Sequence, residues 1–337
     1  MIEHLSNMQI PHRHKYQWTP ILMRFFLLLC LGLGSCEKVI DIDIDNQQLV
    51  VVNGAPSVGR ELFVNISRAQ YFLDTNSQHP VADVDLTLTV NGVDMSPCRV
   101  EGCNYFFSHI VQANDQISLS LNTPVTGKVT SSTVVPPKPP ISDFEALLDT
   151  TGTFNLGLVT FRMDDFAGLR EYYHITIAEH DSGVRYSPYR EEYDTIDTVY
   201  NTQFFCATKP LNDAAVDQSM MNFFTNLLTT DSLIDGQGCE VSLILFMLVD
   251  TNEVEGFTHR YTLTVGSVSK ERFRYLQDVV QTSSVASILS EAIPMYSNIV
   301  GSKATGVFGG VAQQKFDLNL PELPHPHHTP TRKCAQN

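Results

Sequence analysis

The chain of 337 residues carries 22 lysine and arginine residues against 37 aspartate and glutamate residues, a formal net charge of −15. Apolar residues make up 43% and charged residues 18%, a composition that excludes a chain disordered throughout. The length predicts two domains. Nucleic acid is excluded as a partner, because phosphate backbones are bound by a cationic face that so acidic a chain lacks.

The N-terminal region predicts a signal peptide. Arg24 precedes an apolar run at 25–33 that is too short to span a bilayer permanently. The run ends in Leu33, Gly34, Ser35 and Cys36, which resembles the bacterial lipobox, where a peptidase cleaves after two small residues and the cysteine is acylated. We expect residues 1–35 to be removed, with 1–22 as a mis-assigned start if translation begins at Met23. Cys36 would then anchor the protein to a membrane.

Residues 36–46 predict an acidic tether. Asp41, Asp43 and Asp45 alternate with isoleucines, which places the acids on one face of an extended segment. An EF-hand loop would need glycine and glutamate where Asn46 and Val52 stand, so we predict no calcium site. Acidic residues directly after a lipidated cysteine are similar to surface-export signals of Bacteroidota lipoproteins, which predicts exposure at the cell surface.

Residues 47–135 predict an N-terminal β-sandwich domain of immunoglobulin or fibronectin type. Apolar and polar residues alternate with a period of two at 62–67, 84–90 and 117–122. Asn91 and Gly92 predict a hairpin turn. Four prolines at 136–140 predict a stiff linker, because proline cannot donate to a strand ladder and favours an extended helix.

Residues 141–320 predict a C-terminal β-rich domain with helical insertions, and the fold class is therefore mainly β with two tandem sandwiches. Strands are expected at 158–163, 172–178 and 241–249. A helix is expected near 270–283, after the N-cap candidate Ser269. A second helix is expected near 219–230, where apolar residues have helical spacing: Met220, Phe223, Phe224, Leu227 and Leu228. We predict that both apolar stripes face the core rather than a partner.

Residues 321–337 predict a disordered tail. Histidines at 325, 327 and 328 stand among prolines, and such tracts can bind metal when a scaffold holds them. No scaffold is evident in the surrounding sequence, and we predict no metal site here.

The cysteines predict an oxidising compartment, since exported proteins pair their thiols. Cys98 and Cys103 flank a short hairpin, and Cys206 and Cys239 bracket the helix expected near 219–230. We predict both pairs as candidate disulfides. A structural zinc site would need close pairs such as CxxC, and the sequence contains none.

The sequence contains no nucleophile elbow, zincin motif or dinucleotide fingerprint. Carboxylates at 164–165, 171 and 191–192 leave a glycoside hydrolase open as an alternative, although such pairs arise by chance in an acidic chain. We therefore predict no catalytic residue, no cofactor and no enzymatic activity.

The segment 186–200 is the most ligand-like part of the sequence. Four tyrosines give it aromatic surface of the kind that glycans bind: Tyr186, Tyr189, Tyr193 and Tyr200. Two interpretations stay open, a ligand loop and a long hairpin decorated with tyrosines, and the hairpin is preferred.

Several sequence elements together are similar to one protein family. They lie at 36–41, 49–54, 64–68, 171–173, 294–301 and 306–310. Over residues 36–320 the chain resembles the lipoproteins of the "domain of unknown function 4249" family. Ser297-Asn298-Ile299 and Gly306-Val307-Phe308-Gly309 are the most specific elements, and Ser302-Lys303 stands where a glycine is often seen.

The resemblance implies an accessory lipoprotein of Bacteroidota, in the setting of TonB-dependent outer-membrane transporters. No catalytic residues are assigned to the family, so none are carried over. We expect a non-enzymatic outer-membrane lipoprotein, anchored through Cys36, that acts as an accessory or binding module for a transporter or surface assembly. The alternatives are a free-standing surface protein that binds glycans or peptides, a carboxylate-dependent hydrolase and a structural spacer.

Overall fold

The computed structural model describes residues 49–69, 79–149, 155–165, 168, 170–187, 190, 192–213, 215, 223–232, 236–247, 257–283 and 295–320. All of them lie in one compact unit of the chain, Asp45–Asn337. The signal peptide, the motif Leu33, Gly34, Ser35 and Cys36, the acidic tether to residue 46 and the tail 321–337 lie outside the described residues, and these assignments stay predictions.

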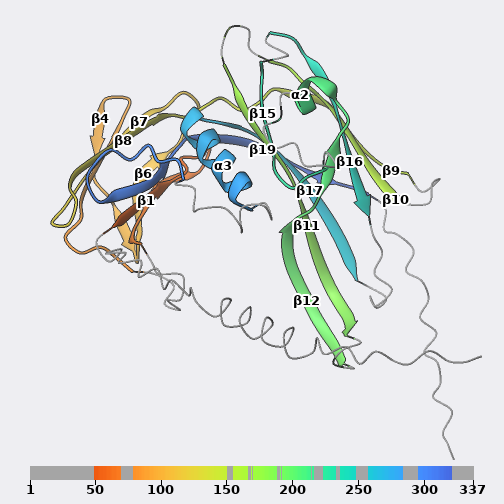
Figure 1. Cartoon of the computed structure of the whole chain (residues 1–337), viewed down its shortest axis with the longest axis horizontal. Helices are drawn as coiled ribbons and strands as arrows, with labels where there is room; N and C mark the ends of the chain where they lie inside the picture. The colour runs from red at the N-terminus through yellow and green to blue at the C-terminus, as the bar shows by residue number, and fades with distance from the viewer. Residues whose placement is uncertain are drawn as a thin grey trace, which may run out of the picture. The chain divides into compact units, whose positions relative to one another are not determined.

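Two sheets built largely from the first third of the chain share one hydrophobic core (Figure 1). Their strand orders are β18-β1-β2-β6-β5 and β4-β3-β7-β8. The strands are β1 (Val50–Gly54), β2 (Glu61–Arg68), β3 (Asp85–Val90), β4 (Val93–Met95), β5 (Arg99–Glu101), β6 (Asn104–Ile110), β7 (Gln116–Thr123), β8 (Gly127–Val134) and β18 (Ala304–Phe308). Exposed and buried residues alternate along β7, as the period of two predicts.

The turn predicted at Asn91-Gly92 is confirmed and joins β3 to β4. Both residues have positive φ angles, 51° and 83°, the geometry of a tight hairpin turn.

Two further sheets bury their side chains in a second core. Their orders are β14-β13-β16-β10-β9 and β12-β11-β17-β19, and β15 also pairs with β11. The strands are β9 (Ile141–Asp149), β10 (Asn155–Met163), β11 (Tyr172–Ser187), β12 (Glu192–Asn201), β13 (Phe204–Cys206), β14 (Phe223–Phe224), β15 (Leu227–Thr230), β16 (Cys239–Met247), β17 (Thr258–Val268) and β19 (Val311–Leu318). The mainly β fold with antiparallel sheets is thus confirmed.

The helices of the described residues are α2 (Lys209–Asp213) and α3 (Lys270–Ser283). Helix α3 occupies the range expected near 270–283, and its N-cap is Ser269, whose Oγ accepts a hydrogen bond from the Arg272 N–H at 3.3 Å. Phe273 is buried against Tyr172, with ring centroids 4.9 Å apart, and the partly buried Leu276 and Val280 join the same small hydrophobic cluster, so the apolar stripe of α3 packs against the body of the protein.

The helix expected near 219–230 is wrong for residues 223–230, which form β14 and β15. Phe224 pairs with Phe204, and Leu227 and Leu228 pair with β11. Leu227 and Leu228 are adjacent and both fully buried, so this stretch is covered on two sides. Helical spacing of apolar residues also fits two short strands of this kind, and the pairing with β11 decides between them.

The predicted disulfides are wrong, because Cys98, Cys103, Cys206 and Cys239 are all free thiols. Cys98 precedes β5 at the open end of its hairpin, and Cys103 lies in the turn at the closed end. Cys206 lies opposite Leu243, four residues along β16 from Cys239. Four residues of strand span about 13 Å, well beyond the reach of a disulfide.

The family elements at 49–54 and 306–310 meet where β1 pairs in parallel with β18. Asn298 binds both backbone groups of Phe308, accepting from its N–H at 2.9 Å and donating to its carbonyl at 2.8 Å. A Cβ at Gly54 would lie 2.6 Å from the Phe308 ring, so only glycine fits there. Lys303, where the resemblance leads us to expect glycine, has a φ of 52°, a conformation that glycine adopts readily.

We predict that the cysteines react as free thiols in the folded chain. Without reductant, iodoacetamide should modify Cys98, which is exposed, and should modify the buried Cys103 and Cys206 only after unfolding. Peptide mass spectrometry reads the result, with Cys98→Ser as the control that removes the fast reaction. A peptide linked through 98–103 or 206–239 would contradict the free thiols.

We predict that Asn298→Ala lowers the free energy of unfolding by about 1–3 kcal/mol, because two backbone groups of Phe308 lose their partner. Urea unfolding measures the change. Val300→Ala is the matched control, since Val300 is 68% exposed and surface substitutions cost about 0.5 kcal/mol or less. An equal loss of unfolding free energy in both variants would show that the Asn298 side chain does not stabilise the pairing of β1 with β18.

Candidate functional site

Polar side chains continue the core-facing side of β11 toward its hairpin end. Tyr173, Ile175 and Ile177 are fully buried, and the same alternation brings Glu179 and Asp181 to that face. Both carboxylates are only 8% exposed. Two acids thus occupy positions at which the strand would otherwise carry apolar residues.

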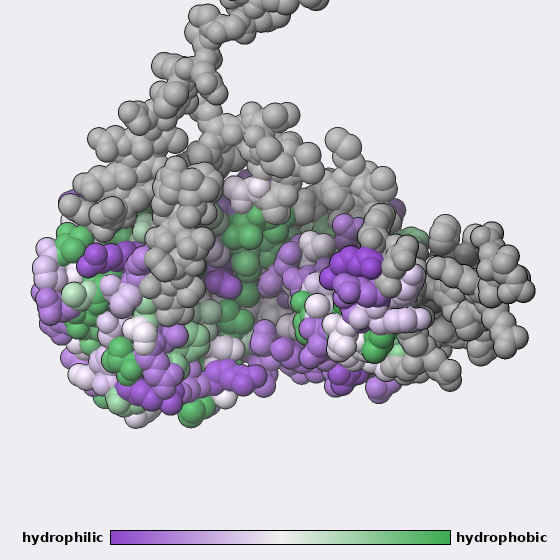
Figure 2. All heavy atoms as spheres, turned by 90° about the horizontal axis from the view of Figure 1, so that it is seen from below, coloured by the Kyte–Doolittle hydropathy of each residue, from purple (hydrophilic) through white to green (hydrophobic). Residues whose placement is uncertain are grey.

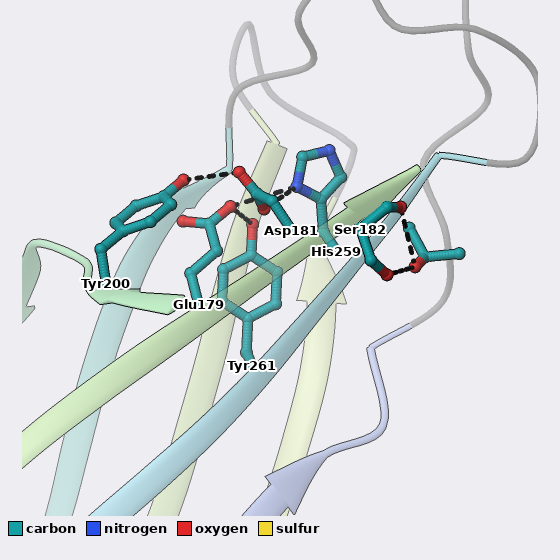
Figure 3. A network of polar contacts seen from close by, with 7 residues as sticks. Glu179, Asp181, Ser182, Tyr200, His259 and Tyr261 are labelled. Atoms are coloured by element: carbon teal, nitrogen blue, oxygen red, sulfur yellow. Dashed lines mark hydrogen bonds and ion pairs between the residues drawn. The ribbon is translucent and has the colours of Figure 1, made fainter. Parts of the chain in front are cut away.

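Strand register supplies their neighbours. On β17, His259 lies opposite Asp181 and Tyr261 lies opposite Glu179. On β12, Tyr200 lies opposite Glu179 from the other side. Directly opposed residues share a face of the sheet, so five polar side chains from three neighbouring strands converge (Figure 3).

The five side chains form one hydrogen-bonded cluster, which we call the β11 cluster: Glu179, Asp181, Tyr200, His259 and Tyr261. His259 Nδ1 lies 2.8 Å from Asp181 Oδ1 and 3.2 Å from Glu179 Oε1. The Tyr261 hydroxyl donates to Glu179 Oε1 at 2.7 Å. The Tyr200 hydroxyl donates to Asp181 Oδ2 at 3.0 Å.

An aromatic ring and a close backbone approach fix the position of His259. Phe257 is 1% exposed, and its ring centroid lies 5.1 Å from that of His259. Gly183 makes room for Phe257, because a Cβ there would lie 2.7 Å from Phe257 Cα. Beside them, the hydroxyls of Ser182 and Thr258 are 2.8 Å apart (Figure 3).

The electrostatics favour the ionised form of Glu179 and the protonated forms of Tyr200 and Tyr261. Burial raises the pKa of Glu179, but hydrogen bonds from His259 and Tyr261 and the charge of His259 outweigh it, so the pKa lies below its ordinary value. Burial and the charge of Glu179 raise the pKa of both Tyr200 and Tyr261. The tyrosines therefore act as hydrogen-bond donors to the acids.

Glu179, Asp181 and His259 could together hold a metal ion. Their candidate ligand atoms, one imidazole nitrogen and two carboxylate oxygens, all lie within 4.8 Å of one another. Imidazole and carboxylate together are ligands that Zn²⁺ and similar divalent ions accept.

The tyrosines predicted as a ligand loop lie on the β11–β12 hairpin. Tyr186 and Tyr193 are cross-strand partners with ring centroids 5.2 Å apart, and Tyr193 is 68% exposed. Tyr200 belongs to the β11 cluster, and Tyr189 lies outside the described residues. The hairpin interpretation is confirmed, and ligand binding by these tyrosines stays a prediction.

The carboxylates considered for hydrolysis fall at separate places. Asp165 and Glu171 both contact the Tyr173 hydroxyl, at 2.7 and 2.6 Å, and Glu171 is buried. Asp164 binds Arg162. Glu192 binds Arg190, and Glu191 lies outside the described residues. A single hydroxyl therefore joins Asp165 and Glu171.

A polar cleft of about 520 Å³ lies on the outer side of β3, β7 and β8. Serine and threonine side chains form much of its wall, and it is completed by Lys128, Glu271, Tyr296 and Asn298. Its volume falls within the range of small-molecule sites.

Four of the five members of the β11 cluster were not predicted from the sequence. The alternation that runs through Tyr173, Ile175 and Ile177 stays in phase at Glu179 and Asp181, but the predicted strand ended at residue 178. This continued alternation was the sequence signal that could have placed Glu179 and Asp181 on the core-facing side of the strand. His259 and Tyr261 depend on the register between β11 and β17, which lie far apart in the sequence.

We predict that Glu179 contributes a pH-dependent part of stability. Its pKa is lowered on folding, so its contribution is present above its ordinary value of 4.5 and is lost as the pH falls through the folded value. With EDTA present, Glu179→Gln should therefore flatten the acid limb of the free energy of unfolding. Urea unfolding at a series of pH values measures it. The exposed Glu192→Gln is the control, and an unchanged acid limb in Glu179→Gln would contradict the prediction.

The comparisons with known proteins concern the chain as a whole. The family model described as "Domain of unknown function (DUF4249)" matches residues 37–317. No curated protein matches the chain. Since the match covers far more than half of the sequence and includes every member of the β11 cluster, the chain belongs to the DUF4249 family.

Proposed function

We propose that this protein is a non-enzymatic lipoprotein of the outer membrane that serves as an accessory or binding module for a TonB-dependent transporter or surface assembly. The observation that carries the proposal is the lipobox at 33–36, followed directly by an acidic segment and then by the mainly β body. Acylation at Cys36 would hold that body at the membrane. A Bacteroidota source and exposure at the cell surface are parts of the same proposal.

Hydrophilic patches on the described surface suit a body that an anchor would hold beside a membrane (Figure 2). None of the helices in the described residues is both long and apolar enough to cross a membrane. Hydrophilic residues occupy much of the described surface on the face drawn in Figure 2. Several acyl chains hold a protein durably, whereas one chain alone is marginal.

The length of the segment between Cys36 and the first strand sets how far the body could lie from an anchored Cys36. About 13 residues, fully extended, span at most about 45 Å. That length allows the body to stand clear of the lipid head groups and to meet a neighbouring membrane protein from the side.

We further propose that the two pairs of sheets are tandem sandwiches of the immunoglobulin or fibronectin type, the second with helical insertions. Sandwiches of this kind mostly present binding loops or act as spacers. Such a body suits an accessory role, with the linker at 136–140 and the hairpin tyrosines as parts that a partner could contact.

The proposal predicts that a transporter is captured with the lipidated protein. The tagged protein is crosslinked mildly in native membranes and purified, and its companions are identified by mass spectrometry. Cys36→Ala is the control, because it removes the acylated residue and leaves the body intact. We expect a TonB-dependent transporter with the wild-type chain and its loss with the variant.

Other outcomes would contradict the proposal in different ways. A protein that carries no lipid would remove its basis at Cys36. A transporter captured equally by both forms would show that the anchor does not direct the association.

A free-standing surface protein that binds a glycan or another hydroxylated ligand is the second candidate. The polar cleft favours it, since serine and threonine hydroxyls with one lysine and one glutamate match the hydrogen-bonding groups of a sugar. A lipidated, surface-exposed protein that captures no transporter would favour this candidate over the first.

A further inference from the structure

The β11 cluster combines chemically different donors in one buried place. We propose that Glu179, Asp181 and His259 form a binding site for one divalent metal ion of the Zn²⁺ class. The ligands are His259 Nδ1 and one oxygen from each carboxylate, completed by water. This proposal depends neither on the lipid anchor nor on a transporter.

The distances between the ligand atoms fit a shared ion. Zinc lies about 2.0–2.2 Å from imidazole nitrogen and carboxylate oxygen. Two such ligands, separated by an octahedral or tetrahedral angle, then lie about 2.8–3.6 Å apart. The Nδ1 atom of His259 lies 2.8 Å from Asp181 Oδ1 and 3.2 Å from Glu179 Oε1. One candidate ligand atom from each of the three residues lies within 4.8 Å of the others, so side-chain adjustment could bring all three around one ion.

A divalent cation would neutralise the two buried carboxylates more fully than His259 alone can. Glu179 and Asp181 are each 8% exposed, and within the described residues the ion pairs of both are with His259. Even a protonated imidazole leaves one negative charge of this pair uncompensated, and an uncompensated buried charge is strongly destabilising. A divalent ion with a neutral imidazole balances both carboxylates.

Binding requires a proton to move from Nδ1. If the ring is an imidazolium, that proton passes to solvent as the Nδ1 lone pair takes the metal. If the ring is neutral, it adopts the tautomer with the hydrogen on Nε2, and no proton is released.

The surroundings of the three ligands suit a metal site. The hydroxyls of Tyr261 and Tyr200 donate to Glu179 and Asp181, which orients the carboxylates and leaves their other lone pairs for the ion. Phe257 closes one side of the imidazole. Tyr200 is 46% exposed, so the edge of the cluster beside β12 offers a path from solvent.

The donor types select the class of ion. An imidazole ligand favours zinc and its transition-metal neighbours over Mg²⁺ and Ca²⁺, which prefer oxygen throughout. The absence of a thiolate from this donor set disfavours Cu(I).

Zinc binding by the full chain tests the proposal. The parent chain carries His325→Gln, His327→Gln and His328→Gln, so that the tail histidines cannot bind the ion. After equilibrium dialysis against Zn²⁺, inductively coupled plasma mass spectrometry gives the zinc bound per chain. We expect one zinc in the parent and its loss in His259→Gln.

The matched control is His180→Gln, on β11 between Glu179 and Asp181. His180 also contacts a carboxylate, with Nε2 2.7 Å from Asp197 Oδ1, but it lies outside the cluster. We expect this variant to keep its zinc. Free thiols are common to all these chains, so thiol binding would not separate them.

A second variant keeps all three ligands and therefore protects the test from a folding failure. Tyr261→Phe removes only the hydroxyl that orients Glu179, and we expect about 10–100-fold weaker zinc binding. Circular dichroism in EDTA checks the fold, and the visible spectrum of bound Co²⁺ reports whether nitrogen and oxygen ligands surround the ion.

Two results would overturn the proposal. The first is a folded parent chain that binds no zinc and shows no rise in melting temperature with the ion, which would mean that His259 alone pairs with the two acids. The second is zinc binding that is the same in the parent and in a folded Tyr261→Phe or His259→Gln variant.

Discussion

The parallel pairing of β1 with β18 is the interaction on which the rest of the structure depends. Asn53 accepts a hydrogen bond from Val307, 254 residues further along the chain. Closing so long a loop costs conformational entropy, although the cost grows only slowly with length. Close packing of Gly54 on Phe308 and the two bonds from Asn298 help to offset it. The most specific family elements therefore describe how distant parts of the chain are joined rather than a reaction.

Register plays the same part in the second pair of sheets. The β11 cluster exists because Asp181 meets His259 and Glu179 meets Tyr261 across the ladder of β11 and β17. A slip of one residue would turn every side chain of β11 to the opposite face. Glu179 and Asp181 therefore point to the same side of β11 as the buried Ile175 and Ile177. Packing of these isoleucines in the core thus fixes the position of the polar cluster.

Local patterns in the sequence predicted local structure well. Alternation identified strands such as β7, the dipeptide Asn91-Gly92 identified a hairpin turn, and Ser269 marked the start of α3. Where distant pairing decides, the sequence was insufficient. Leu227 and Leu228 have helical spacing with their neighbours, yet they pair with β11. The disulfide predicted between Cys206 and Cys239 failed for the same reason, since the register of β13 against β16 cannot be deduced from sequence spacing.

Within the described residues, β12 stands at the end of its sheet and pairs only with β11. Such an edge invites a second molecule to add its own strand. Glu192, Asp194 and Asp197 lie along it, so two copies approaching edge to edge would bring like charges together. The acidic edge therefore disfavours pairing between copies of the protein. This would matter most at high local concentration, as when many copies were anchored in one membrane.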